Sequence, residues 1–417
     1  MKKLLKGIGI IIVLLIVAAG IYYFANNESL PEGKQGNEAD ALAQKMVTAV
    51  NKKAFDTTEI LEWSFRGKNY YKWKKQEGLV EVSWNDHQVT LNLEDHSKSV
   101  GENPETIQKA LDNFNNDSFW LLAPYKVFDE GVERRLVMHE EKEALLVTYN
   151  VGGTTPGDSY LWILDDDGMP MSYKMWVSII PIGGVSATWS DWRVSDSGIK
   201  LPTTHKLSIF GIELNMGEVK AYNPNADALA HKVLKAIKHE AYKKTRYIDW
   251  SFGGRRSYKW DKELHKVEVS WNDAKVMLQP NDMKKSIAYL KGEKIDNNAN
   301  LVKRAWDLFN NDSFWLVAPH KLFEPGIYRN IEMIDGKEAL RVKYSTGGTT
   351  PGDSYVWILD ENFIPKSYQM YVPSMKMVAT PATWEDWIET ESGTMLPKNH
   401  TFASGRSLSM GDVKGYN

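Results

Sequence analysis

The chain contains the same sequence twice, and this duplication constrains its fold more than any other feature. The first copy begins at Ala39 and the second at Ala226, an offset of 187 residues. The offset becomes 195 after Asp273, where the second copy carries eight extra residues. The longest shared segments are VEVSWND (80–86 and 267–273), FNNDSFWL (114–121 and 309–316) and GGTTPGDSY (152–160 and 347–355). A repeat of about 190 residues can form a domain with its own core, so we predict two tandem domains, 39–223 and 226–417.

The N-terminal segment predicts a membrane anchor. Lys2, Lys3 and Lys6 precede an uncharged, mostly apolar run over residues 8–25. A helix of this length extends about 27 Å, close to the ~30 Å hydrocarbon core of a bilayer. Basic residues that flank a membrane helix remain on its cytoplasmic side. Residues 1–25 would therefore anchor the chain with both domains exported. A cleaved signal peptide is the alternative. The polar residues 26–38 predict a flexible tether.

Each copy combines helical and strand patterns. Leu42 and Met46 begin an apolar stripe of helical spacing, and Ile107, Leu111 and Phe114 predict a second helix. We expect this second helix to end at Asn115-Asn116, because asparagine tolerates a left-handed cap. The remaining segments alternate apolar and polar residues, as in antiparallel strands. Runs of strands with few helices indicate an α+β fold, with helices packed on the concave face of a curved antiparallel sheet.

The composition excludes several kinds of site. The chain has no cysteine, which excludes disulfides, iron–sulfur clusters and thiol nucleophiles. The formal charge of −3 removes the usual electrostatic reason to expect a nucleic-acid partner. The sequence 165–168 (DDDG) resembles the start of a calcium loop, but the second copy has Phe363 in place of the glycine. We therefore expect a hairpin turn there, and no metal or cofactor.

One pair of histidines allows a hydrolase hypothesis. His205 is retained as His400, and it would need to meet Asp158 and Ser159 to form a triad. The corresponding residues in the second copy are His400, Asp353 and Ser354. However, the segment lacks the second glycine of a nucleophile elbow, and Thr-Pro-Gly-Asp-Ser is typical of a turn. We therefore expect a protein without catalytic activity and keep the hydrolase as an alternative.

The tryptophans are the remaining feature, since seven pairs of them correspond between the copies. Packing in a structural core is the first interpretation. Alternatively, some rings line an apolar cavity, where burial of acyl chain gains about 0.8 kcal/mol per methylene. The candidate lining residues are Trp84, Trp120, Trp162, Trp271, Trp315 and Trp357. The corresponding arginines, Arg134 and Arg329, are candidates for contact with a lipid headgroup, with a surface ion pair as the alternative.

Each copy resembles the LolA/LolB-like superfamily of bacterial lipoprotein carriers, and in particular its uncharacterised members. The resemblance lies in the segment NDSFWL with a following proline (116–121 and Pro124, 311–316 and Pro319), and in the WSF and YKW strands (63–65 and 71–73). It implies an open, incomplete β-barrel with a helical lid over an apolar cavity. It also implies binding of a lipid or lipoprotein acyl chain without catalysis.

This chain differs from those carriers in having two copies and an apparent helical anchor. We therefore expect a tethered holder or relay in the bacterial cell envelope, anchored in the inner (cytoplasmic) membrane with both domains on the periplasmic side. A structural or protein-interaction module, with every aromatic ring in the core and an unknown protein partner, is the alternative.

Overall fold

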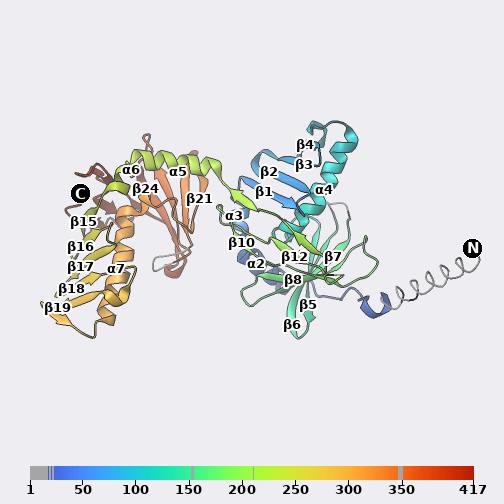
Figure 1. The fold of residues 1–417 in the computed structure, drawn as a ribbon, viewed down its shortest axis with the longest axis horizontal. Coiled ribbons are helices and arrows are strands. Elements are labelled where there is room, and N and C mark those ends of the chain that lie inside the picture. The colour runs from blue at the N-terminus through green and yellow to red at the C-terminus, as the bar shows by residue number, and fades with distance from the viewer. Residues whose placement is uncertain (1–16, 18–19, 21–22, 152–154, 210, 346–350) are drawn as a thin grey trace, which may run out of the picture. The chain divides into compact units, whose positions relative to one another are not determined.

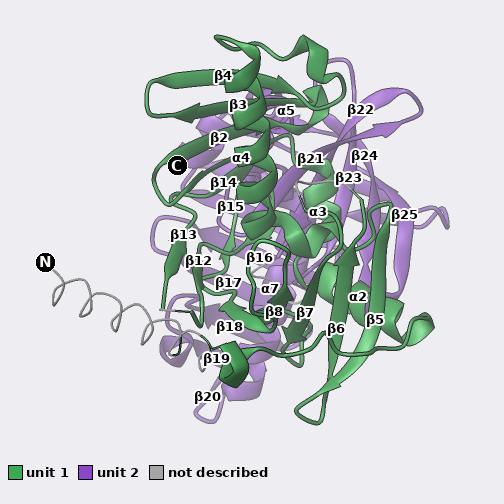
Figure 2. Ribbon diagram, turned by 90° about the vertical axis from the view of Figure 1, so that its right-hand side faces the viewer, with its two compact units in different colours: residues 1–222 green, residues 223–417 purple. Residues whose placement is uncertain are grey.

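The computed structural model describes residues 17, 20, 23–151, 155–209, 211–345 and 351–417. The chain divides into two compact units, Met1–Tyr222 and Asn223–Asn417 (Figures 1 and 2). The boundary immediately precedes Asn223, where the first copy was predicted to end. Most of the predicted anchor lies outside the described residues. No helix in the described part of the chain has the length and apolar character needed to cross a membrane.

Unit 1 contains two five-stranded antiparallel sheets. The first has the order β14 (Lys220–Tyr222), β1 (Ile60–Phe65), β2 (Asn69–Lys74), β3 (Leu79–Trp84) and β4 (His87–Asn92). The second has the order β5 (Val132–His139), β6 (Lys142–Tyr149), β7 (Asp158–Leu164), β8 (Pro170–Trp176) and β9 (Val185–Thr188). Two short ribbons pair β10 (Arg193–Val194) with β11 (Lys200–Leu201) and β12 (Thr204–Lys206) with β13 (Glu213–Asn215). The fold is therefore α+β, and no sheet formed by the described residues closes on itself.

The helices of unit 1 pack on different sheets. They are α2 (Asn37–Ala49), α3 (Lys52–Thr57) and α4 (Pro104–Leu122), with 3₁₀ turns η1 (Lys75–Glu77), η2 (His96–Lys98) and η3 (Ala123–Lys126). Helix α2 packs on β5 and β6, where its buried residues Ala43, Met46 and Val47 join the core. Helix α4 packs on β3 and β4 (Figure 1). Its C-terminal half reaches the second sheet, because Phe119 contacts Tyr160 of β7.

The predicted end of the second helix at Asn115-Asn116 was wrong. Helix α4 continues through both asparagines to Leu122. The cost of an asparagine inside a helix is at most about 0.7 kcal/mol. Against that cost, Asp117 in the next position is buried and accepts hydrogen bonds from Asn69 Nδ2 (2.7 Å) and Tyr71 Oη (2.5 Å) of β2. Contacts with the sheet therefore override the capping signal.

Unit 2 repeats this architecture. Its first sheet has the order β20 (Glu293–Ile295), β19 (Ile287–Leu290), β18 (Ala274–Leu278), β17 (Lys266–Trp271), β16 (Arg256–Asp261), β15 (Tyr247–Phe252) and β30 (Lys414–Tyr416). The second sheet runs β21 (Ile327–Ile334), β22 (Lys337–Tyr344), β23 (Ser354–Leu359), β24 (Pro365–Val372) and β25 (Met377–Thr383). The eight extra residues of the second copy fall in the β19–β20 hairpin, which widens the first sheet.

The smaller elements of unit 2 match those of unit 1 except for the 3₁₀ turns η1 and η6, which each occur in one unit only. Its helices are α5 (Pro224–Ala236), α6 (His239–Lys244) and α7 (Ala299–Val317), with η4 (Met283–Lys285), η5 (Ala318–His320) and η6 (Pro373–Met375). Its ribbons pair β26 (Ile388–Glu389) with β27 (Met395–Leu396) and β28 (Asn399–Thr401) with β29 (Ser407–Ser409). Helix α7 takes the place of α4, and α5 that of α2.

The segment predicted as a flexible tether is bound to unit 1. Glu28 N–H donates to Gly183 O (3.0 Å), and its carboxylate pairs with Lys174 Nζ (2.8 Å). Trp176 Nε1 donates to Glu28 O (2.8 Å). Lys34 forms a two-way antiparallel bridge with Leu136 on the free edge of β5 (2.8 and 2.9 Å). The segment therefore acts as a strap on the outer face of the second sheet.

The outer face explains why the strap binds there. In unit 1 this face carries an apolar cluster whose members are Val137, Ala144, Leu146, Leu161 and Trp176. In unit 2 the positions of Val137 and Leu146 hold Glu332 and Arg341, which form an ion pair (2.5 Å). A polar face needs no cover, whereas apolar surface gains by losing contact with water. The sequence pattern of residues 26–38 alone did not show this partner.

We expect the amides of Glu28 and Lys34 to exchange with deuterium more slowly than those of an unstructured peptide, because both donate to unit 1. Replacing Lys174 with alanine removes a partly exposed ion pair, and should speed exchange at Glu28 by up to about fivefold. The control is Lys142→Ala, an exposed lysine outside the strap contacts. Exchange at the unstructured rate in the native protein would show that the segment is a tether after all.

Candidate functional site

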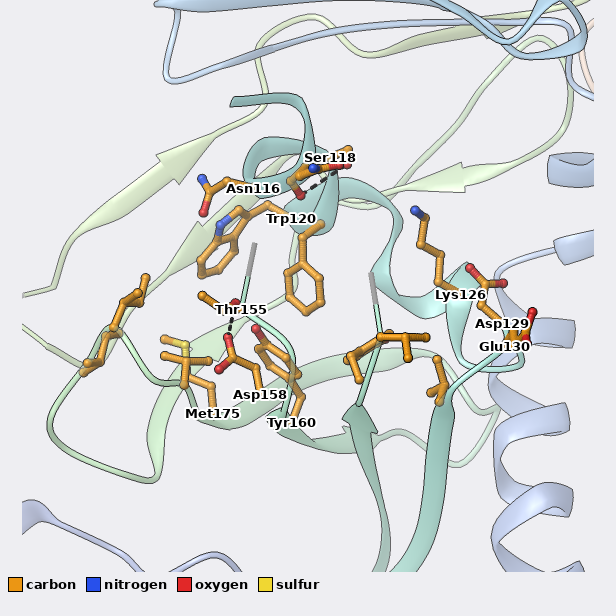
Figure 3. Close-up of a pocket in the computed structure, with 18 of the residues that line it drawn as sticks. Asn116, Ser118, Trp120, Lys126, Asp129, Glu130, Thr155, Asp158, Tyr160 and Met175 are labelled. Atoms are coloured by element: carbon orange, nitrogen blue, oxygen red, sulfur yellow. Dashed lines mark hydrogen bonds between the residues drawn. The ribbon is translucent and has the colours of Figure 1, made fainter. Parts of the chain in front are cut away.

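Unit 1 contains a cavity of about 490 Å³ between the C-terminal half of α4 and one end of the second sheet (Figure 3). Helix α4 contributes Phe119 and Trp120, and strands β7 and β8 contribute Tyr160 and Met175. Leu207, directly after β12, closes one side. The cavity therefore lies where the helix that covers the first sheet reaches the second.

Aromatic rings form much of the cavity wall. The ring of Phe119 lies 4.5 Å from that of Tyr160 and 5.7 Å from that of Tyr149, and the two tyrosine rings are 5.8 Å apart. Tyr149 Oη donates to Ala123 O (3.2 Å). Burial raises the pKa of both tyrosines, so the phenols stay uncharged. The wall is thus apolar and neutral at physiological pH.

The cavity lining also contains polar and charged side chains. Asp158 accepts from Thr155 Oγ1 (2.5 Å) and from Ser178 N–H (2.9 Å), so its carboxylate holds the loop beside β7 (Figure 3). Lys126 and Asp129 lie on the opposite rim. Burial lowers the pKa of Lys126 and raises that of Asp129, and their mutual attraction opposes both shifts.

Unit 2 holds the equivalent cavity, with a volume of about 520 Å³. The same positions line it, offset by 195 residues: Phe314, Trp315, Tyr344, Tyr355 and Met370 replace Phe119, Trp120, Tyr149, Tyr160 and Met175. The Phe314 and Tyr355 rings are 4.6 Å apart, as in unit 1. Some lining side chains differ yet stay large and apolar, as where Phe402 replaces Leu207. The cavity is therefore common to both copies.

The predicted tryptophans have three different positions. Trp120 and Trp315 line the two cavities. Trp162 and Trp357 are fully buried, each edge-on to another indole (Trp189 at 4.9 Å and Trp384 at 6.2 Å). They share a sheet face with the cavity tyrosines but lie where other rings fill the space. Trp84 and Trp271 lie on the first sheet of each unit, half-buried beside its core and outside the cavity lining.

The paired arginines lie outside the cavities and join elements within each unit. Arg134 Nε pairs with Asp40 of α2 (2.6 Å), and its Nη1 donates to Val127 O (2.8 Å) and Val132 O (3.1 Å). Arg329 repeats this pattern with Asp227 (2.7 Å), Leu322 O (2.5 Å) and Ile327 O (3.0 Å). These donors are already committed to protein acceptors, so the geometry supports the ion-pair alternative over headgroup contact.

Sequence reasoning missed Phe119, Tyr149, Tyr160 and Met175, which line the first cavity with Trp120. The signal was present, because each of them is retained in the second copy. The prediction considered tryptophan alone. Retention in both copies also does not distinguish a ring that lines a cavity from a ring that is packed in the core.

The hydrolase triad does not assemble. His205 Nδ1 contacts Thr188 O (3.0 Å), so this ring nitrogen faces the backbone and not Asp158 or Ser159. Ser159 Oγ instead pairs with Thr148 Oγ1 (2.8 Å). In the second copy His400 repeats the contact with Thr383 O (2.8 Å), and Ser354 Oγ accepts from Arg341. Among the described residues, neither serine therefore has a base in hydrogen-bond contact.

The predicted hairpin turn after β7 is confirmed. Asp165 Oδ1 accepts from the amides of Asp167 (3.0 Å) and Met169 (2.8 Å), and Gly168 takes a positive φ of 89°. The carboxylate thus shapes the turn. Within the described ranges, no three histidine or acidic side chains gather as a metal site would require.

Comparison with known proteins gives a likeness to solved structures only. No protein-family model matches the chain, and no curated protein matches it. Among solved structures, it is similar to a DUF1329 family protein from Desulfovibrio piger, with 12% identity and a TM-score of 0.28. The match covers 46% of this chain and 92% of the other.

We expect unit 2 to lose stability first as the solution is acidified. Burial lowers the pKa of His205 and His400 to about 4, and that of His320 to about 3. Unit 1 has Tyr125 in place of His320. Because an unfolded histidine has a pKa near 6.5, the unfolded state binds more protons between about pH 6.5 and 4, so stability falls as the pH drops through this window. Each histidine contributes a loss of up to ~3 kcal/mol.

Urea unfolding at pH 7 and pH 4.5, followed by pulse-labelling mass spectrometry, distinguishes the two units. His320→Tyr, which installs the residue of unit 1, should reduce the acid sensitivity of unit 2 toward that of unit 1. Equal sensitivity of the native units would contradict the expected effect of His320.

Proposed function

We propose that this protein is a membrane-anchored, extracytoplasmic binding protein whose units each hold a lipid or lipoprotein acyl chain, or another apolar ligand, without catalysis. The observation that carries this proposal is the pair of equivalent cavities, of about 490 and 520 Å³. Both volumes fall within the range of about 300–1,000 Å³ that is usual for small-molecule sites. The aromatic and aliphatic part of each wall suits a ligand that gains by burial, and polar side chains complete the lining.

The energetics favour a chain-like ligand. Burial of about ten methylenes gains about 8 kcal/mol, enough to offset a substantial part of the cost of association. The wall supplies rings and the flexible side chains of Met175 and Met370, which adapt to irregular ligands. The rings and methionines that both linings retain fit a ligand recognised by hydrophobicity.

The cavity mouths support loading from an apolar environment. Ile179 lines the first cavity yet is 71% exposed, and Met375 at the second is 60% exposed. Exposed apolar side chains beside a pocket are typical of binding surfaces. An anchor at residues 1–25 would keep both cavities close to the inner membrane, on its periplasmic side, and the open curved sheet with a helical lid of a LolA-like fold belongs to the same proposal.

The alternative of a structural or protein-interaction module accounts for part of the molecule only. The packing of Trp162 against Trp189 is what an aromatic core requires. However, such a module has no need of the same cavity in both units. We therefore favour ligand binding.

Photolabelling of the full-length protein in bacterial membranes, with a diazirine-bearing fatty acid, tests the proposal. Labelled peptides should contain lining residues of both cavities, such as Trp120 and Trp315. Val177→Trp should fill the first cavity, and lower labelling there by at least about tenfold, equivalent to 1.4 kcal/mol. Val372→Trp should do the same in the second cavity alone.

The control is Val194→Trp, an exposed position outside both linings. Unfolding curves establish that each variant is folded, since overpacking costs about 1–3 kcal/mol. If labelling avoids both cavities, or persists in a folded variant with a filled cavity, the proposal fails.

A further inference from the structure

A cationic groove adjoins the second cavity. Arg256, at the start of β16, and Lys303 and Arg304 of α7 line this groove. The groove and the cavity share two lining residues, Trp306 and Asn311. A ligand whose chain fills the cavity can therefore extend its polar end along α7 into a basic surrounding.

Contacts within the protein hold these cations in place, but they do not use all of the capacity of the cations to bind an anion. Arg256 forms a two-point contact with the buried carboxylate of Asp312 (2.6 and 3.1 Å), which fixes its guanidinium beside α7. Lys303 pairs with Asp307 one turn along the helix (2.6 Å). Within the described part of the chain, the exposed Arg304 has no carboxylate partner. An anion at this groove would thus meet a guanidinium that is still available.

The first cavity has a different surrounding, although its interior is the same. Its adjoining groove shares Asn115 and Asn116 with it, and is lined by Gln108 and Lys109 where α7 has Lys303 and Arg304. The position of Arg256 is occupied by a neutral asparagine, Asn69.

The opposite rim changes in the same direction. Glu130 lines the first cavity, and its counterpart at the second is the uncharged Pro325. The second cavity therefore gains positive charge on one side and loses negative charge on the other. Neither of these charge differences alters the apolar wall. The difference between the two cavities therefore concerns the polar end of a ligand, which stays outside the wall.

We propose that the second cavity selects single-chain amphiphiles with an anionic headgroup, whereas the first cavity does not discriminate in their favour. This inference rests on the proposed function, because it assigns a headgroup preference to a cavity that must first hold a chain. Trp306 fits the junction between the two, since an indole presents an apolar ring and an N–H donor. Partly exposed ion pairs contribute modestly, so the effect is a preference and not an absolute requirement.

The test compares two photoreactive lysolipids with the same diazirine acyl chain, lysophosphatidylglycerol and lysophosphatidylcholine, on the full-length protein in membranes. At the second cavity, the ratio of anionic to zwitterionic labelling should exceed the ratio at the first by about threefold to tenfold, as one or two exposed ion pairs predict. The excess should shrink as salt is raised, because the charges are solvent-exposed. Each molecule carries both cavities, which makes the comparison internal.

Three variants assign the effect to the groove. Lys303→Gln combined with Arg304→Gln should lower anionic labelling of the second cavity while zwitterionic labelling persists. The reciprocal Gln108→Lys should raise the ratio at the first cavity. The control is Lys284→Gln with Lys285→Gln in η4, which removes the same charge from unit 2 outside the groove.

The outcomes separate this inference from the proposed function. If neither lysolipid labels either cavity, the proposed function fails. If both label both cavities with equal ratios, or the control variant acts like the groove variant, chain binding stands and the headgroup preference is refuted. Displacement of both lysolipids by excess inorganic phosphate would also overturn it, because it would make the groove a phosphate site independent of the chain.

Discussion

In each unit, the structure depends on one long helix that contacts both sheets. In unit 1, α4 is tied to the first sheet through buried Asp117, which Tyr71 and Asn69 bond from β2. Two and three residues later, Phe119 and Trp120 face the second sheet. The anchoring carboxylate fixes the helix against the first sheet, and the rings beyond it contact the second sheet at Tyr160. The cavity lies beside this junction.

The two copies share their interiors and differ at their surfaces. Both keep the anchored helix, the buried indole pair and the ring-lined cavity. They diverge on the outer face of the second sheet, where unit 1 accepts the strap and unit 2 carries the Arg341–Glu332 ion pair. They diverge again beside the cavity, in the charges along α4 and α7. The two copies thus keep the same core and the same cavity, and differ where their surfaces meet solvent.

Several features of fold and site followed from residue patterns, and the exceptions have a common cause. Alternation identified strands such as β3, and the shared segments led to Trp120. The helix end at Asn115-Asn116 was misplaced because the partners of Asp117 come from a strand more than forty residues away. Likewise the strap looked flexible because its partners, Lys174 and Leu136, lie far along the chain. Local propensity is weak compared with such contacts, so these errors fell where distant residues decide.

The sequence by itself determined the duplication, the α+β character and the set of aromatic positions that both copies retain. Only the tertiary structure decided which of those rings enclose empty space. Trp162 and Tyr160 lie two residues apart on one strand and face the same way, yet one is sealed by Trp189 and the other borders the cavity. The difference arises from what packs above each ring, and packing depends on helices and ribbons from elsewhere in the chain.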